Sequence, residues 1–325
     1  MIGPALVRAT LLCAAATVLA ACATTGGPAP VATTRVEPMP HLVAPVVYTP
    51  HRVYDVTAGS FIDFETLAAR AATADVVFFG EQHGHAPTHR MQLALLEALA
   101  RRGNATLSME MFERDVAHLV SGYVAGSVDH GTFLTGSRPW PRYFPDYHPL
   151  VEAARNNGWM VIAANVPRSL ANQVAREGLA TLDALPAQAR AHVAVQIECP
   201  EDDYRTRFIA EMSRHPGSAA DSPEAEAARN QRYYESQCVK DETMAESIVA
   251  AVARGAARPV LHVTGAFHTD HGDGIPARTL RRDGGLQMLS ITTVPVADLD
   301  ALDPAPHAGR ADYLLFTLAE PRTGG

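Results

Sequence analysis

Residues 76–83 read VVFFGEQH: four apolar residues, then a glycine, two further residues and a histidine. The same order occurs in residues 261–268, LHVTGAFH, where a strand-like run again ends in Gly265 and His268. Such apolar runs predict strands that are buried on both faces, and glycine permits the tight turn that follows. Ligands of open α/β sheets bind beyond the carboxyl ends of such strands. The repetition therefore predicts that His83 and His268 face one site.

The rest of the chain alternates apolar β-rich runs with segments of helical period. This alternation predicts a three-layer α/β domain with a central, largely parallel or mixed sheet that helices cover on both faces. Residues 179–257 lack strand signals and predict an inserted helical subdomain, which includes a charged helix over residues 224–248. The strand runs are residues 76–79, 106–109, 160–163, 260–263, 286–293 and 313–318, and the last of them is expected at an edge of the sheet.

The N-terminus has the layout of a bacterial lipoprotein signal. Arg8 precedes an apolar run over residues 9–21, which is shorter than the roughly 20 apolar residues of a membrane span. The run ends in Leu19-Ala20-Ala21-Cys22, which resembles a lipobox and implies cleavage before Cys22 and its acylation with palmitate or a similar chain. An ordinary signal peptide with an incidental cysteine is the alternative.

This layout predicts three parts: a signal peptide over residues 1–21, a lipidated Cys22 with a Pro-rich tether over residues 22–52, and a domain over residues 53–325. Alanine rather than aspartate follows Cys22. In a two-membrane bacterium this favours the outer membrane, with the domain in the periplasm or at the cell surface.

The charge of the chain argues against a nucleic-acid partner. The formal net charge is −8 at pH 7 and the arginines are scattered, so a nucleic-acid partner is not expected.

Two of the four cysteines belong to the predicted N-terminal signal: Cys13 leaves with the signal peptide and Cys22 is lipidated. Cys199 and Cys238 then remain in an oxidising compartment, where either a disulfide between them or two free thiols fits the sequence.

Further histidines surround the two turns. His85 and His89 follow the first, and His271 follows the second. Imidazoles in such numbers suit a transition metal or haem. Local capping or packing is an equal alternative for each of these three side chains.

Acidic and basic residues also lie at the ends of predicted strands. Glu81 lies inside the first turn, Glu110 closes the run at residues 106–109, and Arg168 follows the run at residues 160–163. A buried carboxylate needs a metal, an arginine or a histidine beside it, and an arginine can bind a carboxylate or a haem propionate in bidentate fashion. An ion pair between Glu110 and Arg168 that only orders the strand ends is the alternative.

An aromatic segment, PWPRYFPDYHP at residues 139–149, has too many prolines for a helix or an inner strand. It predicts an ordered loop before a helix that begins near residue 150. Loops of this kind often line ligand pockets, and Tyr143 or Tyr147 could bind ferric haem through its phenolate. Rings that only cover the sheet edge are the alternative.

Together these segments resemble the ChaN-like haem-binding uptake lipoproteins, which belong with Tiki proteases, TraB proteins and erythromycin esterases. The likeness runs in order over residues 71–282. It departs from the family in having Thr88-His89 where paired histidines are expected, and in having His148 after Tyr147. The segments that carry it are GEQH (80–83), MEMF (109–112), YHPLVE (147–152), ANVPR (164–168), KDETMA (240–245) and GAFH (265–268).

The resemblance implies haem capture at the outer membrane for iron uptake, with two protomers paired around the ligand. It implies that Glu81, His83, Glu110, Arg168 and His268 line a shared cavity. By the same likeness, Tyr147 is the first candidate for an iron ligand. Tyr143 is the second candidate. The other residues expected to bind the cofactor or its metal are His83, His89 and His268.

A metal-dependent, peptidase-like hydrolase of the Tiki superfamily is the competing function. Mn, Co or Zn would polarise a carbonyl group and activate water, with Glu81 as the general base. Its other catalytic residues would be His83, Glu110 and His268. Three functions are thus expected, in this order: a non-enzymatic haem-binding protein, the metal-dependent hydrolase, and an envelope scaffold with a purely structural cavity.

Overall fold

The computed structural model describes residues 48–214 and 222–320 of the chain. The predicted signal peptide, Cys22 and nearly all of the predicted tether lie outside the described residues. From Tyr48 onward the chain forms one compact unit, and its first strand begins at His51, two residues before the expected domain boundary. None of the described helices is both long and apolar enough to cross a membrane.

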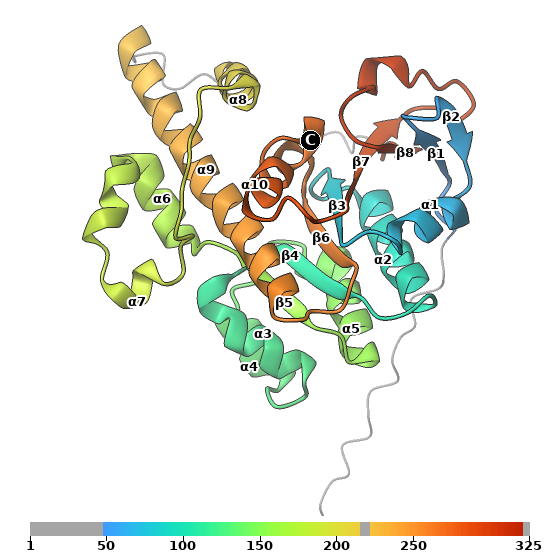
Figure 1. Cartoon of the computed structure of the whole chain (residues 1–325), viewed down its shortest axis with the longest axis horizontal. Helices are drawn as coiled ribbons and strands as arrows, with labels where there is room; N and C mark the ends of the chain where they lie inside the picture. Colours follow the sequence, from blue (N-terminus) through green and yellow to red (C-terminus); the bar gives the residue numbers. More distant parts are fainter. Residues whose placement is uncertain (1–47, 215–221, 321–325) are drawn as a thin grey trace, which may run out of the picture. The chain divides into compact units, whose positions relative to one another are not determined.

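An eight-stranded sheet forms the middle layer of this unit (Figure 1). Six neighbouring strands pair in parallel; β1 pairs antiparallel with β8, and β2 pairs antiparallel with β1 at the edge. The strand order is β2-β1-β8-β7-β3-β6-β4-β5. This arrangement confirms the predicted α/β class with a mixed, largely parallel sheet. The strands are β1 (His51–Asp55), β2 (Ser60–Ile62), β3 (Val76–Glu81), β4 (Thr106–Glu113), β5 (Val161–Asn165), β6 (Val260–Gly265), β7 (Met288–Val296) and β8 (Tyr313–Leu318).

Strand β8 lies inside the sheet, so the prediction that it forms an edge is wrong. It pairs in parallel with β7 on one side and antiparallel with β1 on the other. In β1 only Val53 and Asp55 are buried, and β2 is three residues long. Such short strands with little apolar content carry no strong strand signal, so local sequence does not separate them from the tether.

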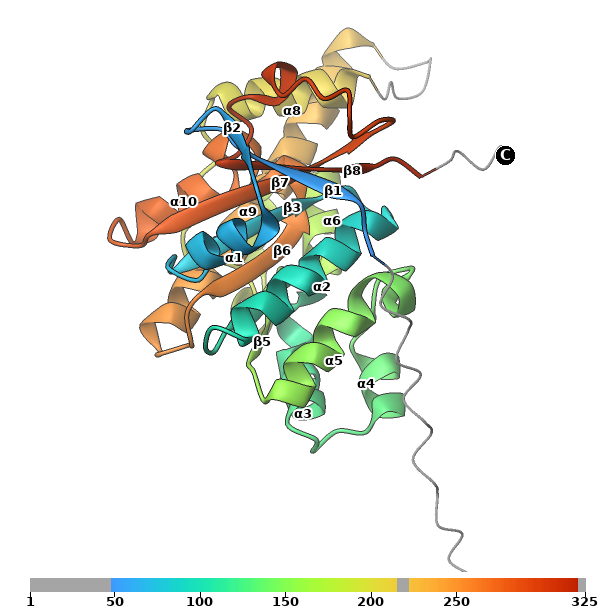
Figure 2. The same ribbon diagram turned by 90° about the vertical axis from the view of Figure 1, so that its right-hand side faces the viewer.

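Helices cover both faces of the sheet, as Figure 2 shows for α1, α2 and α5 on one of them. One face carries α1 (Phe64–Ala71), α2 (Ala86–Ala100), α3 (Ala117–Val124), α4 (His130–Gly136) and α5 (His148–Asn157). The other face carries α9 (Pro223–Ala253) and α10 (Ile275–Arg282), with α6 (Arg168–Glu177) packed against α9.

Strand β3 shows why an unbroken apolar run marks an inner strand. All six of its residues are buried. Val77 and Phe79 belong to the core that α1 to α5 close, whereas Val76 and Phe78 belong to the core under α9 and α10. Successive side chains of a strand point to opposite faces, so both sets must be apolar when both faces are covered.

The predicted helical insertion is present, and its longest helix also closes the sheet. Helix α9 begins where the side chain of Ser222 accepts a hydrogen bond from the Ala225 backbone nitrogen. Its C-terminal half buries Met244 and Ile248 against Val76 of the sheet. The insertion therefore contributes a layer of the domain. Its other members are a short helical turn (Leu179–Ala184), α7 (Ala187–Arg190) and α8 (Asp203–Ser213).

The register between β3 and β6 determines where the two glycine-containing turns lie. These strands are parallel neighbours, and Glu81 at the end of β3 stands opposite Gly265 at the end of β6. The turns that follow therefore bring His83 and His268 to the same carboxyl edge of the sheet.

Candidate functional site

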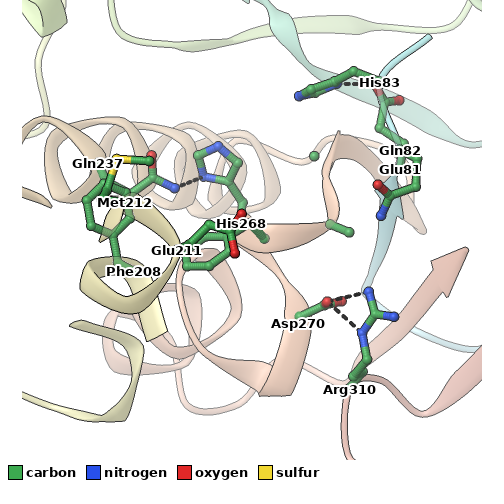
Figure 3. Close-up of a pocket in the computed structure, with 13 residues that line it drawn as sticks. Glu81, Gln82, His83, Phe208, Glu211, Met212, Gln237, His268, Asp270 and Arg310 are labelled. Atoms are coloured by element: carbon green, nitrogen blue, oxygen red, sulfur yellow. Dashed lines mark hydrogen bonds and ion pairs between the residues drawn. The ribbon is translucent and has the colours of Figure 1, made fainter. Parts of the chain in front are cut away.

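A cavity of about 480 Å³ opens at the carboxyl ends of β3 and β6. Its further walls come from α8, α9 and the segment before β8. Figure 3 shows His83 on one side of this cavity, with Phe208 and Met212 of α8 on another. The residues that line it are Glu81, Gln82, His83, Phe208, Glu211, Met212, Gln237, Gly265, Ala266, Phe267, His268, Asp270 and Arg310.

His83 is the most accessible imidazole of the cavity. Its side chain is 51% exposed, and its Nδ1 lies 2.8 Å from Oε1 of the buried Glu81. The hydrogen bond to Glu81 raises the pKa of His83, although burial opposes the shift. A Cβ atom at Gly265 would lie 3.0 Å from Nε2 of His83, so the glycine makes room for the ring. Glu81 thus fixes one ring nitrogen and leaves Nε2 on the cavity side.

Glu81 is a buried carboxylate that several donors surround. The Tyr147 hydroxyl donates to Oε1 at 2.7 Å, and the Gln92 amide donates to Oε2 at 2.7 Å. Nδ1 of the buried His89 lies 3.6 Å from Oε2, too far for a hydrogen bond, and contacts Oε1 of Gln92 at 3.0 Å instead. Charge-assisted hydrogen bonds of this kind compensate the loss of water around a buried charge. The set holds Glu81, and through it His83, in one orientation.

His268 differs from His83 because it is buried between two carboxylates. Its Nδ1 lies 2.5 Å from Oδ1 of Asp241, and its Nε2 lies 3.4 Å from Oε1 of Glu110. Burial disfavours the charged ring, but Glu110 and Asp241 outweigh it and raise the pKa of His268 to about 10. Glu110 and Asp241 therefore stabilise the charged form of the His268 ring.

Helices α8 and α9 supply residues to this network that the sequence analysis missed. Asp241 also accepts a hydrogen bond from the Tyr204 hydroxyl at 2.6 Å. Gln237 donates to the same hydroxyl at 3.1 Å and lies 3.2 Å from Nδ1 of His268. Asp241 stands in KDETMA, one of the segments that carry the family resemblance, but no role was assigned to it from the sequence.

Glu110 and Arg168 do not pair, so the alternative interpretation of an ion pair between them is wrong. Glu110 accepts from the Thr264 hydroxyl at 2.7 Å and from the Gly265 backbone nitrogen at 2.8 Å. Burial would raise the pKa of Glu110, but His268 holds it well below its usual range. Arg168 is 57% exposed and lies 4.0 Å from Oε1 of Glu113, because β4 places Glu113 farther along the sheet edge.

The aromatic loop borders the site through Trp140. The centroid of its ring system is 5.3 Å from that of His83, and the Arg168 guanidinium lies 6.0 Å from the Trp140 centroid. Residues 143–147 form a π-helical turn rather than an irregular loop. The aromatic loop therefore contributes both to the rim of the cavity and to the core.

Both candidate tyrosines are buried and lie outside the cavity lining. Tyr143 packs against Phe112 and Phe133, and its hydroxyl is 3.3 Å from Nδ1 of His148. Tyr147 is 2% exposed and donates to Glu81. Burial raises the pKa of both phenols far above the ordinary value, so both are neutral hydroxyls in this conformation.

The outlying histidines have local roles. His85 contacts the Thr88 hydroxyl at 2.8 Å and the Leu318 carbonyl oxygen at 3.0 Å. His89 stacks edge-on against Tyr147 at 5.0 Å between centroids, behind the cavity. His271 is exposed on the turn after His268. These three side chains do not join His83 and His268 at the cavity.

Within residues 48–214 and 222–320, no group of three or more histidine, cysteine, aspartate or glutamate side chains is arranged to hold a metal ion. His83 and His268 each have a separate carboxylate partner, Glu81 and Asp241. The described residues therefore do not present a preassembled metal site of the hydrolase type.

Comparison with known proteins places this site in context. The family described as haem-binding uptake, Tiki superfamily, ChaN matches residues 67–279 of the chain. The solved structure described as cofacial haem binding to ChaN of Campylobacter jejuni aligns with a TM-score of 0.63 and 16% identity. The alignment covers 83% of this chain and 97% of that chain. At this level of identity, the structural likeness shows a shared fold.

A curated relative comes from a plant. Protein RETICULATA-RELATED 5, chloroplastic, of Arabidopsis thaliana is 26% identical over 278 residues, which is 80% of this chain. The chain spans only 36% of the length of that protein. The match therefore concerns one part of a longer relative.

Proposed function

Because the chain belongs to the ChaN family of haem-binding uptake proteins in the Tiki superfamily, we propose that it binds haem in the cavity beyond β3 and β6. The observation that carries this proposal is the pairing of His83 with Glu81 at the cavity wall. Imidazoles that bind metals usually give their second ring nitrogen to a carboxylate or a carbonyl, which fixes the ring and raises its basicity. His83 is oriented in this way, and its Nε2 would hold the haem iron.

The other walls suit a flat, largely apolar cofactor. Phe208, Met212 and Phe267 bring aromatic and thioether groups to the cavity. Its volume of about 480 Å³ lies within the roughly 300–1,000 Å³ of small-molecule and cofactor sites. Bound haem would supply an iron that accepts a nitrogen ligand, while the residues of the chain bind the ring and exclude water.

The rim offers cations for the propionate groups. Arg168 is exposed next to Trp140, on the His83 side. Arg310 lines the cavity, although its Nε already donates to Asp270 at 2.8 Å. Guanidinium groups bind carboxylates in bidentate fashion, so Arg168 is the better candidate.

In this proposal Tyr147 does not bind the iron and acts on the site only through Glu81. Its hydroxyl donates to Glu81, so its effect on a bound iron passes through Glu81 and His83. Direct ligation by Tyr147 would require the hydroxyl to leave Glu81 and the buried ring to turn outward. Ligation by His83 and ligation by Tyr147 predict different ferric haem spectra.

We also propose that acylated Cys22 anchors the protein at the bacterial outer membrane, where it serves haem and iron uptake. The lipobox-like residues 19–22 and the Pro-rich stretch after them support this location. Pairing of two copies around haem is part of the proposal and rests on the family alone. Loss of palmitate labelling and of membrane fractionation in Cys22→Ser tests the anchor.

A haemin titration of the full chain tests haem binding. We expect a saturable Soret shift at micromolar haemin, weakened in His83→Ala and unchanged in His118→Ala. The control removes an exposed histidine of α3 that does not line the cavity. The absence of a saturable shift in the wild-type protein would overturn the proposal. Stoichiometric Mn, Co or Zn after purification without chelators would favour the hydrolase instead.

A further inference from the structure

Two cysteines lie in one small apolar cluster beside the cavity. Cys238 is fully buried on α9, and Cys199 is partly buried in the segment that leads into α8. Both pack with Tyr204, Phe208 and Tyr234. Both are free thiols in this structure. Phe208, Met212 and Phe267 belong both to this cluster and to the proposed haem contacts, whereas the two cysteines do not line the cavity.

Hydrogen bonds on either side of Cys199 hold it opposite Cys238. The Tyr234 hydroxyl donates to the Pro200 carbonyl oxygen at 2.8 Å, and the Glu198 backbone nitrogen donates to Oε1 of Glu242 at 3.1 Å. Positions 234, 238 and 242 are each four residues apart, so they share one face of the helix. The residues before and after Cys199 are therefore fixed one turn to either side of Cys238.

The electrostatic environment agrees with this proximity. Burial raises the pKa of the Cys238 thiol, and the neighbouring Cys199 thiol adds to the shift through a side-chain hydrogen bond. Cys238 is therefore a poor nucleophile in the folded protein, because the thiolate is the reactive form. Cys199 is the more accessible of the two sulfur atoms and the one that an oxidant reaches first.

We propose that Cys199 and Cys238 form an intramolecular disulfide when the protein meets a disulfide oxidant. The Cys199 thiolate attacks the oxidant and releases one thiol, which gives a mixed disulfide. As the Cys238 sulfur attacks Cys199, its proton passes to the departing thiolate, so that the second thiol is released. The two cysteines lose two electrons and two protons in total, and the oxidant is reduced to two thiols.

This disulfide would link the start of α8, which forms one wall of the cavity, to α9. Cys199 stands four positions before Asp203, the first residue of α8. Helix α8 carries Phe208 and Met212 into the cavity and Tyr204 onto Asp241, the partner of His268. Figure 1 shows α8 beside the N-terminal half of α9. A covalent link at Cys199 therefore holds the start of α8 against the helix that positions His268. The inference does not depend on haem.

Oxidised glutathione is the probe that tests this site. The folded full chain is incubated with it, unreacted thiols are alkylated after denaturation, and peptides are mapped with and without reduction. We expect one linked peptide pair that contains Cys199 and Cys238 within a single chain, and alkylation of these two cysteines only after reduction with dithiothreitol. Cys199→Ser is the control, in which Cys238 stays a thiol because its buried sulfur does not reach the oxidant.

Three results would overturn the proposal. The first is full alkylation of both thiols after oxidant treatment. The second is a stable glutathione adduct on Cys199 while Cys238 remains a thiol. The third is a link between two chains, which non-reducing electrophoresis separates from the intramolecular bond. If Cys199→Ser folds poorly, Cys238→Ala takes its place, because alanine keeps the buried position apolar and circular dichroism confirms the fold.

Discussion

His83 and Tyr147 meet on the same carboxylate oxygen. Nδ1 of His83 lies 2.8 Å from Oε1 of Glu81, and the Tyr147 hydroxyl donates to that atom at 2.7 Å. One residue comes from the turn after β3 and the other from the aromatic loop before α5. Two elements far apart in the sequence thus converge on Glu81, which orients the one accessible imidazole of the cavity.

Replacement of Glu81 by glutamine should weaken haem binding by about 10- to 100-fold, because carboxylate partners of metal-bound imidazoles have effects of this size. Glutamine keeps the size of the side chain but loses the charge that favours a basic His83. Haemin titration measures the change. Glu97→Gln, an exposed position on α2, is the matched control. Unchanged affinity in Glu81→Gln would exclude this role for Glu81.

The ferric haem spectrum should distinguish His83 from Tyr147 as the iron ligand. We expect Tyr147→Phe to keep the Soret and charge-transfer bands of the wild type, and His83→Ala to alter them. The reason is that the buried Tyr147 hydroxyl faces Glu81, whereas His83 faces the cavity. A tyrosinate-like spectrum that disappears in Tyr147→Phe would instead assign the iron to Tyr147. Tyr143→Phe serves as the second phenol control.

His268 should make stability depend on pH. Its pKa of about 10 in the folded protein lies above the ordinary value of 6.5. The charged ring therefore contributes its full stabilisation below about pH 6.5, and this contribution is lost as the pH rises through about 10. The free energy of unfolding of wild type minus that of His268→Gln should fall by a few kcal/mol over this range, on the order set by 1.4 kcal/mol per pKa unit.

Urea unfolding at pH 6.5 and pH 10 measures this difference for both proteins. His118→Gln, which changes an exposed histidine, should show no such dependence. A difference that stays constant between the two pH values would mean that His268 is not held charged by Glu110 and Asp241.

Ile248→Ala should destabilise the whole domain by about 2–5 kcal/mol. Ile248 is fully buried in the core that α9 shares with Val76 and Phe78 of the sheet. Tyr233→Ala on the same helix removes a ring that is 39% exposed and should cost far less. Denaturant unfolding should show one transition that shifts as a unit. A separate early transition of α9, with the sheet unaffected, would contradict the assignment of this helix to a sheet layer.

The sequence alone determined the layered α/β class, the inner strands and the two histidine turns. These features are local: residues 76–79 of strand β3 are all apolar because both faces of the strand are covered, and that requirement is visible without any partner strand. The charged helix over residues 224–248 was predicted because this interval lacks strand signals, and the helix extends over Pro223–Ala253.

The tertiary structure alone decided which side chains meet. Nothing near Glu110 in the sequence shows that it joins His268 rather than Arg168, and nothing near Asp241 shows that it holds His268 from α9. The inner place of β8 depends likewise on β1, which lies more than 250 positions earlier in the chain. Propensity and periodicity act over a few residues, whereas strand order and charge pairing arise from contacts between distant segments once the core has packed.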